Sequence, residues 1–171
     1  MLFGRKDRFA IEATLVSDRS PHEAWGSSCI YAGGVRIGDL AELHCGLAPF
    51  ASMLLEASRS IAELRSERFS DLSDAEVYAF LSKALFTDDG RSIEEMQRDW
   101  DRFGRFNFLT NVGEQFDGWR TFIFSRDVGS LTILASEGDG PPTSFQIHAS
   151  EFIAAVAEFR AWFDTQVEVV T

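Results

Sequence analysis

The spacing of hydrophobic residues changes three times along the 171-residue chain, and this order constrains the fold more than any other feature. Alternation with a period of two, typical of half-buried strands, marks the segment before residue 40 and the segment from Arg105 to His148. Spacings of three and four residues, typical of amphipathic helices, mark the segments between and after them. The order predicts an α+β fold: a single domain over residues 1–171, with a largely antiparallel sheet and helices packed on one face.

The strands are predicted from short alternating segments. Gly33-Gly34 supplies the positive φ angles of a two-residue hairpin turn, so the opening segments form an antiparallel meander. WRTFIFS is apolar on both faces and is expected at the centre of the sheet. The predicted strands are 8–16 (RFAIEATLV), 24–33 (AWGSSCIYAG), 35–37 (VRI), 105–110 (RFNFLT), 119–125 (WRTFIFS), 130–136 (SLTILAS) and 143–148 (TSFQIH).

Four amphipathic helices are predicted. The first covers residues 48–66 and has a proline in its first turn, where proline is tolerated. The second and third open at Ser73 and Ser92, because each serine is followed three residues later by a glutamate, the pattern of a capping box. The fourth covers residues 149–164.

The net charge of −11 is concentrated in two segments. Residues 71–101 hold nine acidic and three basic residues, a net charge of −6, residues 137–171 carry −5, and the rest of the chain is neutral. This balance argues against nucleic acid and anionic membranes as direct partners, and it serves either solubility or attraction of a basic partner. The predicted partner-binding residues are Asp88, Asp89, Glu94, Glu95, Asp99 and Asp101, with Glu137 and Asp139 as a second edge.

The sequence predicts a cytoplasmic protein. Its apolar runs are far shorter than the about 18 residues that span a bilayer, and no secretory signal precedes the first strand. Cys29 and Cys45 have no metal or redox spacing and are expected to be reduced thiols.

No catalytic residue, cofactor or metal site is predicted. His22, His44 and His148 are widely separated, and their spacing matches no zinc pattern. Glu95 and Asp99 share one helical face, but two nearby arginines partly neutralise it. The glycines match no phosphate-binding loop.

Two sequence motifs carry a resemblance to a known family. The first follows the strand FAIEATL and ends in Ile37-Gly38-Asp39, and the second is EQFDGWRTFIF at residues 114–124. Together they resemble a bacterial immunity protein family, immunity protein forty-two, which accompanies polymorphic toxins. The resemblance implies a non-catalytic intracellular protein that binds and neutralises a cognate toxin, without naming that toxin or an oligomeric state. The residues of this fold signature are Trp25, Gly26, Tyr31, Gly34, Gly38, Asp39 and Trp119.

The signature residues are interpreted as parts of the fold. The glycines allow a tight turn and sharp strand ends. Trp25 is expected in the core or against the first helix, with contact to the partner as the alternative. Many toxins that act on nucleic acid are basic, so an acidic surface could cover their binding groove. An adaptor domain and an enzyme with an unrecognised carboxylate site stay open as alternative functions.

Overall fold

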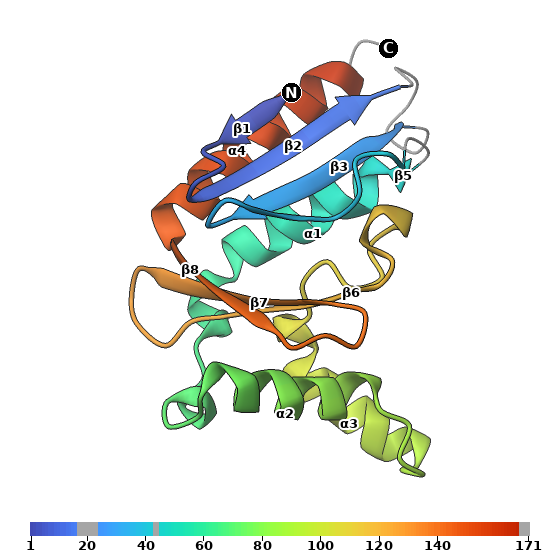
Figure 1. Cartoon of the computed structure of the whole chain (residues 1–171), viewed down its shortest axis with the longest axis vertical. Coiled ribbons are helices and arrows are strands. Elements are labelled where there is room, and N and C mark those ends of the chain that lie inside the picture. The colour runs from blue at the N-terminus through green and yellow to red at the C-terminus, as the bar shows by residue number, and fades with distance from the viewer. Residues whose placement is uncertain (17–23, 43–44, 168–171) are drawn as a thin grey trace.

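The computed structural model describes residues 1–16, 24–42 and 45–167, and three layers follow one another along its longest axis (Figure 1). A five-stranded sheet packs on α1 (Leu47–Arg59) and α4 (Ala149–Val167) in the first layer. A three-stranded sheet forms the middle layer, and α2 (Asp74–Phe86) and α3 (Ile93–Phe103) form the third. His22 and His44 lie outside the described residues. The predicted α+β class, with antiparallel strand pairing and helices packed on the sheets, is confirmed.

The first sheet has the strand order β1-β2-β3-β4, with β5 also paired to β3, and all of its pairs are antiparallel. The predicted hairpin is confirmed, because Gly33 and Gly34 have φ angles of 57° and 85° and Ala32 pairs with Val35. Two short strands were not predicted, since a few residues cannot show an alternating pattern. The strands are β1 (Leu2–Gly4), β2 (Phe9–Leu15), β3 (Trp25–Ala32), β4 (Val35–Ile37) and β5 (Cys45–Gly46).

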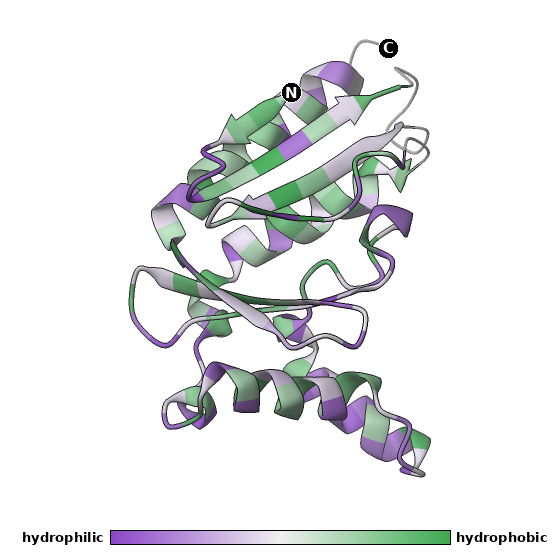
Figure 2. Cartoon of the chain, viewed as in Figure 1, coloured by the Kyte–Doolittle hydropathy of each residue, from purple (hydrophilic) through white to green (hydrophobic). Residues whose placement is uncertain are grey.

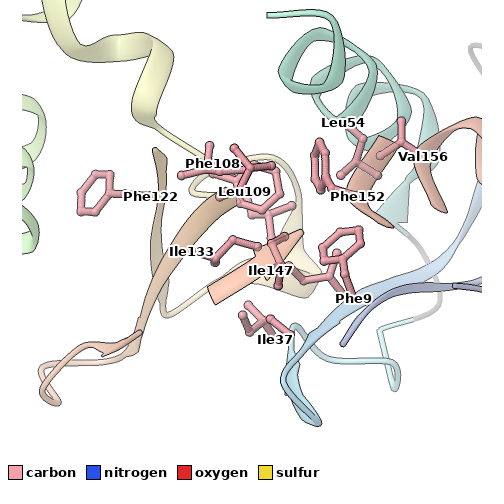
Figure 3. Packing of buried hydrophobic residues seen from close by; sticks show 14 of the residues in the cluster. Phe9, Ile37, Leu54, Phe108, Leu109, Phe122, Ile133, Ile147, Phe152 and Val156 are labelled. Carbon is pink, nitrogen blue, oxygen red and sulfur yellow. The ribbon is translucent and has the colours of Figure 1, made fainter. Parts of the chain in front are cut away.

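The second sheet contains β6 (Trp119–Phe124), β7 (Ser130–Glu137) and β8 (Thr143–His148) in the order β6-β7-β8. The prediction that the first of these strands is central is therefore wrong, since β7 holds that position. The strand is apolar on both faces because both faces of this sheet are covered. Phe122 packs edge-on against Tyr78 of α2, with 5.4 Å between ring centroids, and projects to the opposite side of β6 from Phe108 (Figure 3).

RFNFLT does not form a strand, so this prediction is also wrong. The chain makes a 3-10 turn, η4 (Gly104–Phe106), and then a single antiparallel bridge between Asn107 and Phe122. Leu109 follows with a φ of 63°, a left-handed conformation that interrupts an extended strand. Phe106 and Phe108 are fully buried at alternate positions, which reproduces the strand pattern without strand geometry.

The two predicted capping boxes are confirmed. The hydroxyl of Ser73 accepts a hydrogen bond from the backbone N–H of Glu76 at 3.3 Å, and Ser92 accepts one from Glu95 at 3.2 Å. The first helix is shorter than predicted: α1 ends at Arg59, and the chain continues through the 3-10 turns η2 (Ile61–Leu64) and η3 (Glu67–Phe69).

One cluster of buried hydrophobic residues runs through the layers. Phe9 of β2 packs against Phe152 of α4 with 4.9 Å between ring centroids, and Figure 3 shows Ile147 of β8 beside them. The ring centroid of Phe69 lies 5.4 Å from that of Phe124 on β6 and 6.3 Å from that of Phe80 on α2, so the aromatic contacts continue from the second sheet to the third layer. By contrast, α3 contributes a single buried residue, Phe103. The third layer therefore presents a helix that the core hardly covers.

Candidate partner-binding surfaces

The hairpin of α2 and α3 gathers the six central acidic residues at one end of the molecule (Figure 1). Asp88 and Asp89 lie in the loop between the helices, and Glu94 and Glu95 lie in the first turn of α3, where the helix dipole favours negative charge. Asp99 and Asp101 follow in the second half of the helix. Hydrophilic and hydrophobic residues alternate along this hairpin (Figure 2).

Arg91 holds the two halves of the hairpin together. Its guanidinium group, with a side chain only 19% exposed, lies 2.5 Å from a carboxylate oxygen of Asp89 and 2.7 Å from one of Asp99. It also donates a hydrogen bond of 2.7 Å to the carbonyl oxygen of Thr87 and one of 3.0 Å to that of Lys83, near the end of α2. Asp89 and Asp99 thus share the single positive charge of Arg91 inside the hairpin. Sequence analysis missed this role because it depends on a tertiary contact.

Of the six central acidic residues, the other four have no cationic partner within the described part of the chain. Glu95 accepts a hydrogen bond of 2.9 Å from the backbone N–H of Ser92, and hydrogen bonds from this N–H and from the serine side chain lower the pKa of Glu95. Asp88, Glu94 and Asp101 are exposed, and they are the carboxylates that a basic partner could approach most freely.

An apolar stripe crosses the exposed face of α3. Ile93 is 76% exposed, Met96 is 36% exposed and Trp100 is 45% exposed, and their spacing of three and four residues places them on one side of the helix. The stripe forms one wall of a groove of about 530 Å³, and the end of α2 forms the other. We call this feature the α2–α3 groove, lined by Ala84, Leu85, Phe86, Thr87, Asp88, Arg91, Ile93, Met96, Gln97 and Trp100.

A second acidic surface lies where the two sheets meet. Trp119, the first residue of β6, pairs across the sheet with Glu137 at the end of β7, and both line a hollow of about 610 Å³ and a smaller adjoining one. We call this surface the junction hollow; its carboxylates are Asp39, Glu42, Glu114, Asp117 and Glu137. None of these five makes an ion pair within residues 1–16, 24–42 and 45–167.

The second predicted edge is split between these features. Glu137 belongs to the junction hollow, whereas Asp139 is exposed in the loop between β7 and β8, and both lie in the middle layer. Sequence analysis missed most of the junction hollow, since its acids are far apart in the chain and were balanced in the charge count by basic residues elsewhere.

The two signature motifs contact each other, because the backbone N–H of Asp39 donates a hydrogen bond of 2.7 Å to the carbonyl oxygen of Gln115. Gly38 has a φ of +103°, and a Cβ there would lie 2.7 Å from the Phe116 ring, so only glycine fits without strain. The side-chain amide of Gln115 donates a buried hydrogen bond of 2.9 Å to Ser28 of β3. These contacts join the first sheet to the segment that leads into the second.

Two other signature residues, Gly26 and Tyr31, lie in β3. A Cβ at Gly26 would collide with the backbone carbonyl of Thr14 on β2, so the close approach of these strands needs glycine. The hydroxyl of Tyr31 donates a hydrogen bond of 2.9 Å to Glu12. A hydrogen bond from Lys6, together with this one from Tyr31, outweighs partial burial and lowers the pKa of Glu12.

Trp25 is not a core residue, so the part of the expectation that places it in the core is wrong. It is 46% exposed at the start of β3. The hydrophobic cluster takes Ile30 and Ala32 from the same strand, and alternation places Trp25 on the opposite face.

The two cysteines are buried free thiols. Burial raises the pKa of Cys29 to about 11, which keeps it in the unreactive thiol form. Among the described residues, no three His, Cys, Asp or Glu side chains are placed to hold a metal ion. No helix in the described part of the chain is long and apolar enough to cross a membrane.

Comparison with known families gives one result. The sequence model of a family described as Immunity protein 42 matches residues 1–162. No curated protein and no solved structure matches the chain.

Proposed function

The chain belongs to the immunity protein 42 family, and we propose that it binds a cognate bacterial toxin in the cytoplasm and neutralises it without catalysing a reaction. The family match over residues 1–162 carries this proposal. The two free cysteines support the cytoplasmic location, since thiols stay reduced in that compartment. The exposed acidic hairpin supports binding as the mode of action.

The proposed mechanism is the covering of a basic surface. A toxin that acts on nucleic acid needs lysine and arginine to bind phosphate, so its active groove is cationic. A chain with a net charge of −11 attracts such a groove and accelerates encounter, and close contacts then hold the complex. We assign the steering role to Asp88, Glu94 and Asp101, which are exposed and have no cationic partner in the described residues. Glu137 and Asp139 stay a second candidate edge.

Co-expression with the toxin domain encoded by the adjacent gene tests the function. Cells that make the toxin domain should survive only when this chain is also made. If the chain gives no protection, the immunity function is wrong and an adaptor role becomes the better account.

Charge reversal tests the acidic interface separately. The triple variant Asp88→Lys, Glu94→Lys, Asp101→Lys should bind the toxin domain at least about ten times more slowly at low salt, and with a weaker salt dependence. The matched control reverses three exposed acids elsewhere, Glu56, Asp127 and Glu158, which changes the net charge equally. Equal association rates for the two triple variants would contradict the assignment to the hairpin.

A further inference from the structure

The apolar stripe of α3 lies outside the hydrophobic core cluster of the described residues. The 11-residue helix buries only Phe103 fully, and it leaves Ile93 largely exposed and Met96 and Trp100 partly exposed. Contiguous exposed apolar surface of this kind marks interaction sites. Tryptophan is among the residues that most often dominate binding energy, and methionine adapts its shape to a partner.

The α2–α3 groove is formed before any partner arrives. The capping box at Ser92 fixes the start of α3, and Arg91 ties the loop to both helices. At the other end, Phe103 packs edge-on against Phe80 of α2 with 4.9 Å between ring centroids. A groove held at both ends loses little conformational entropy on binding, which favours affinity.

The charges around the groove indicate its occupant. Asp88 lines one end. Glu94 and Asp101 directly follow Ile93 and Trp100, so both lie on the same side of the apolar stripe, about 100° around the helix from it. A second copy of this chain would bring two segments of net charge −6 together, so like-charge repulsion disfavours it. A segment with apolar side chains flanked by lysine or arginine matches both the stripe and its acidic border.

We propose that the α2–α3 groove seats the toxin, and that its occupant is such an apolar segment flanked by basic residues. This inference rests on the proposed function and specifies the surface that performs it. The acidic border steers the basic side chains, and the apolar stripe supplies most of the binding energy. Trp100, whose ring lies 6.5 Å from that of Phe86 across the groove, is the central contact.

The test measures the Kd between the full chain and a catalytically inactive form of the adjacent toxin domain. Trp100→Ala should weaken binding at least about 30-fold, the effect typical of a central tryptophan. Because Trp100 also contacts Gly104 and Phe86, its loss could disturb α3, and Ile93→Ser is the second variant. Ile93 is 76% exposed, so this change should leave folding intact and weaken binding about tenfold. Ile153→Ser on α4, also at an exposed position, is the matched control and should bind within twofold of wild type.

The results of these measurements distinguish the immunity function from the groove assignment and from the identity of the occupant. If wild type binds and protects, and both groove variants bind within twofold of it, the groove assignment is wrong and the immunity function stands. If wild type neither binds nor protects, both fail. If wild type alone sediments as a dimer and Ile93→Ser makes it monomeric, the occupant is a second copy and the inference is overturned.

Discussion

Gly38→Ala should destabilise the protein more than Gly34→Ala, although both glycines have positive φ angles and both belong to the signature. At Gly34 φ is +85°, and a Cβ would meet nothing within 4 Å. At Gly38 φ is +103°, and a Cβ would lie 2.7 Å from one ring carbon of Phe116 and 3.1 Å from another. Two costs therefore act at Gly38 and one at Gly34.

The magnitudes follow from these two costs. A left-handed conformation costs an alanine about 1–2 kcal/mol, and this cost applies at both positions. Overpacking adds about 1–3 kcal/mol at Gly38 alone. Phe116 has little room to move, because it is 1% exposed and stacks on Phe50 with 5.6 Å between ring centroids. We expect losses of about 1–2 kcal/mol for Gly34→Ala and about 2–5 kcal/mol for Gly38→Ala.

Urea unfolding at 25 °C, followed by tryptophan fluorescence, measures both losses. Phe116→Leu should reduce the free energy of unfolding less in the Gly38→Ala variant than in the wild-type protein, because the smaller side chain relieves the collision with the alanine Cβ. Equal losses for the two glycine variants would refute the view that Gly38 is required by its contact with Phe116. The signature would then have to be explained by the turn conformation alone.

Two further predictions concern the attachment of the helical hairpin. Burial raises the pKa of Asp74, but hydrogen bonds from Ser144 and Arg126 outweigh it, so the pKa lies below the ordinary value of 3.8. A carboxyl group with a lowered folded-state pKa stabilises the protein above its unfolded-state pKa, and this contribution is lost as pH falls through the folded-state pKa. The urea midpoint of the wild-type protein should therefore fall as the pH drops below about 4, and the midpoint of Asp74→Asn should fall less steeply with pH. Identical pH dependence of the two midpoints would contradict the role of this carboxylate. Arg91→Gln should reduce the free energy of unfolding by about 1–3 kcal/mol. It should also increase the rate of amide hydrogen exchange more in α3 than in α4. An unchanged exchange rate in α3 would show that Arg91 does not hold the hairpin.

Local patterns predicted the local structure well. The capping boxes at Ser73 and Ser92 and the turn at Gly33-Gly34 need only neighbouring residues, and all three are present. Alternation reports burial and not strand pairing. It therefore could not show that Phe106 ends a 3-10 turn, that Phe108 follows outside any strand, or that the strands divide into two sheets.

The candidate surfaces also divide into features that depend on neighbouring residues and features that depend on the tertiary fold. The six central acidic residues were found because they are close in sequence, and the structure places them on α3 and the loop before it. The neutralising contacts of Arg91 and the exposure of Trp100 and Trp25 depend on which faces the core leaves uncovered. The junction hollow needs two motifs that lie far apart in the chain and meet in the fold, where Asp39 contacts Gln115 and Gly38 lies against Phe116. Such features require the folded structure.

The most direct test of the central claim is a titration of toxin activity with this protein at toxin concentrations far above the Kd. Neutralisation by binding predicts that activity falls in proportion to the added protein, reaches zero at a fixed stoichiometric ratio and does not change with incubation time. Progressive loss of toxin activity at a small fraction of that ratio would indicate catalysis and contradict the account, as would full toxin activity in the presence of excess protein.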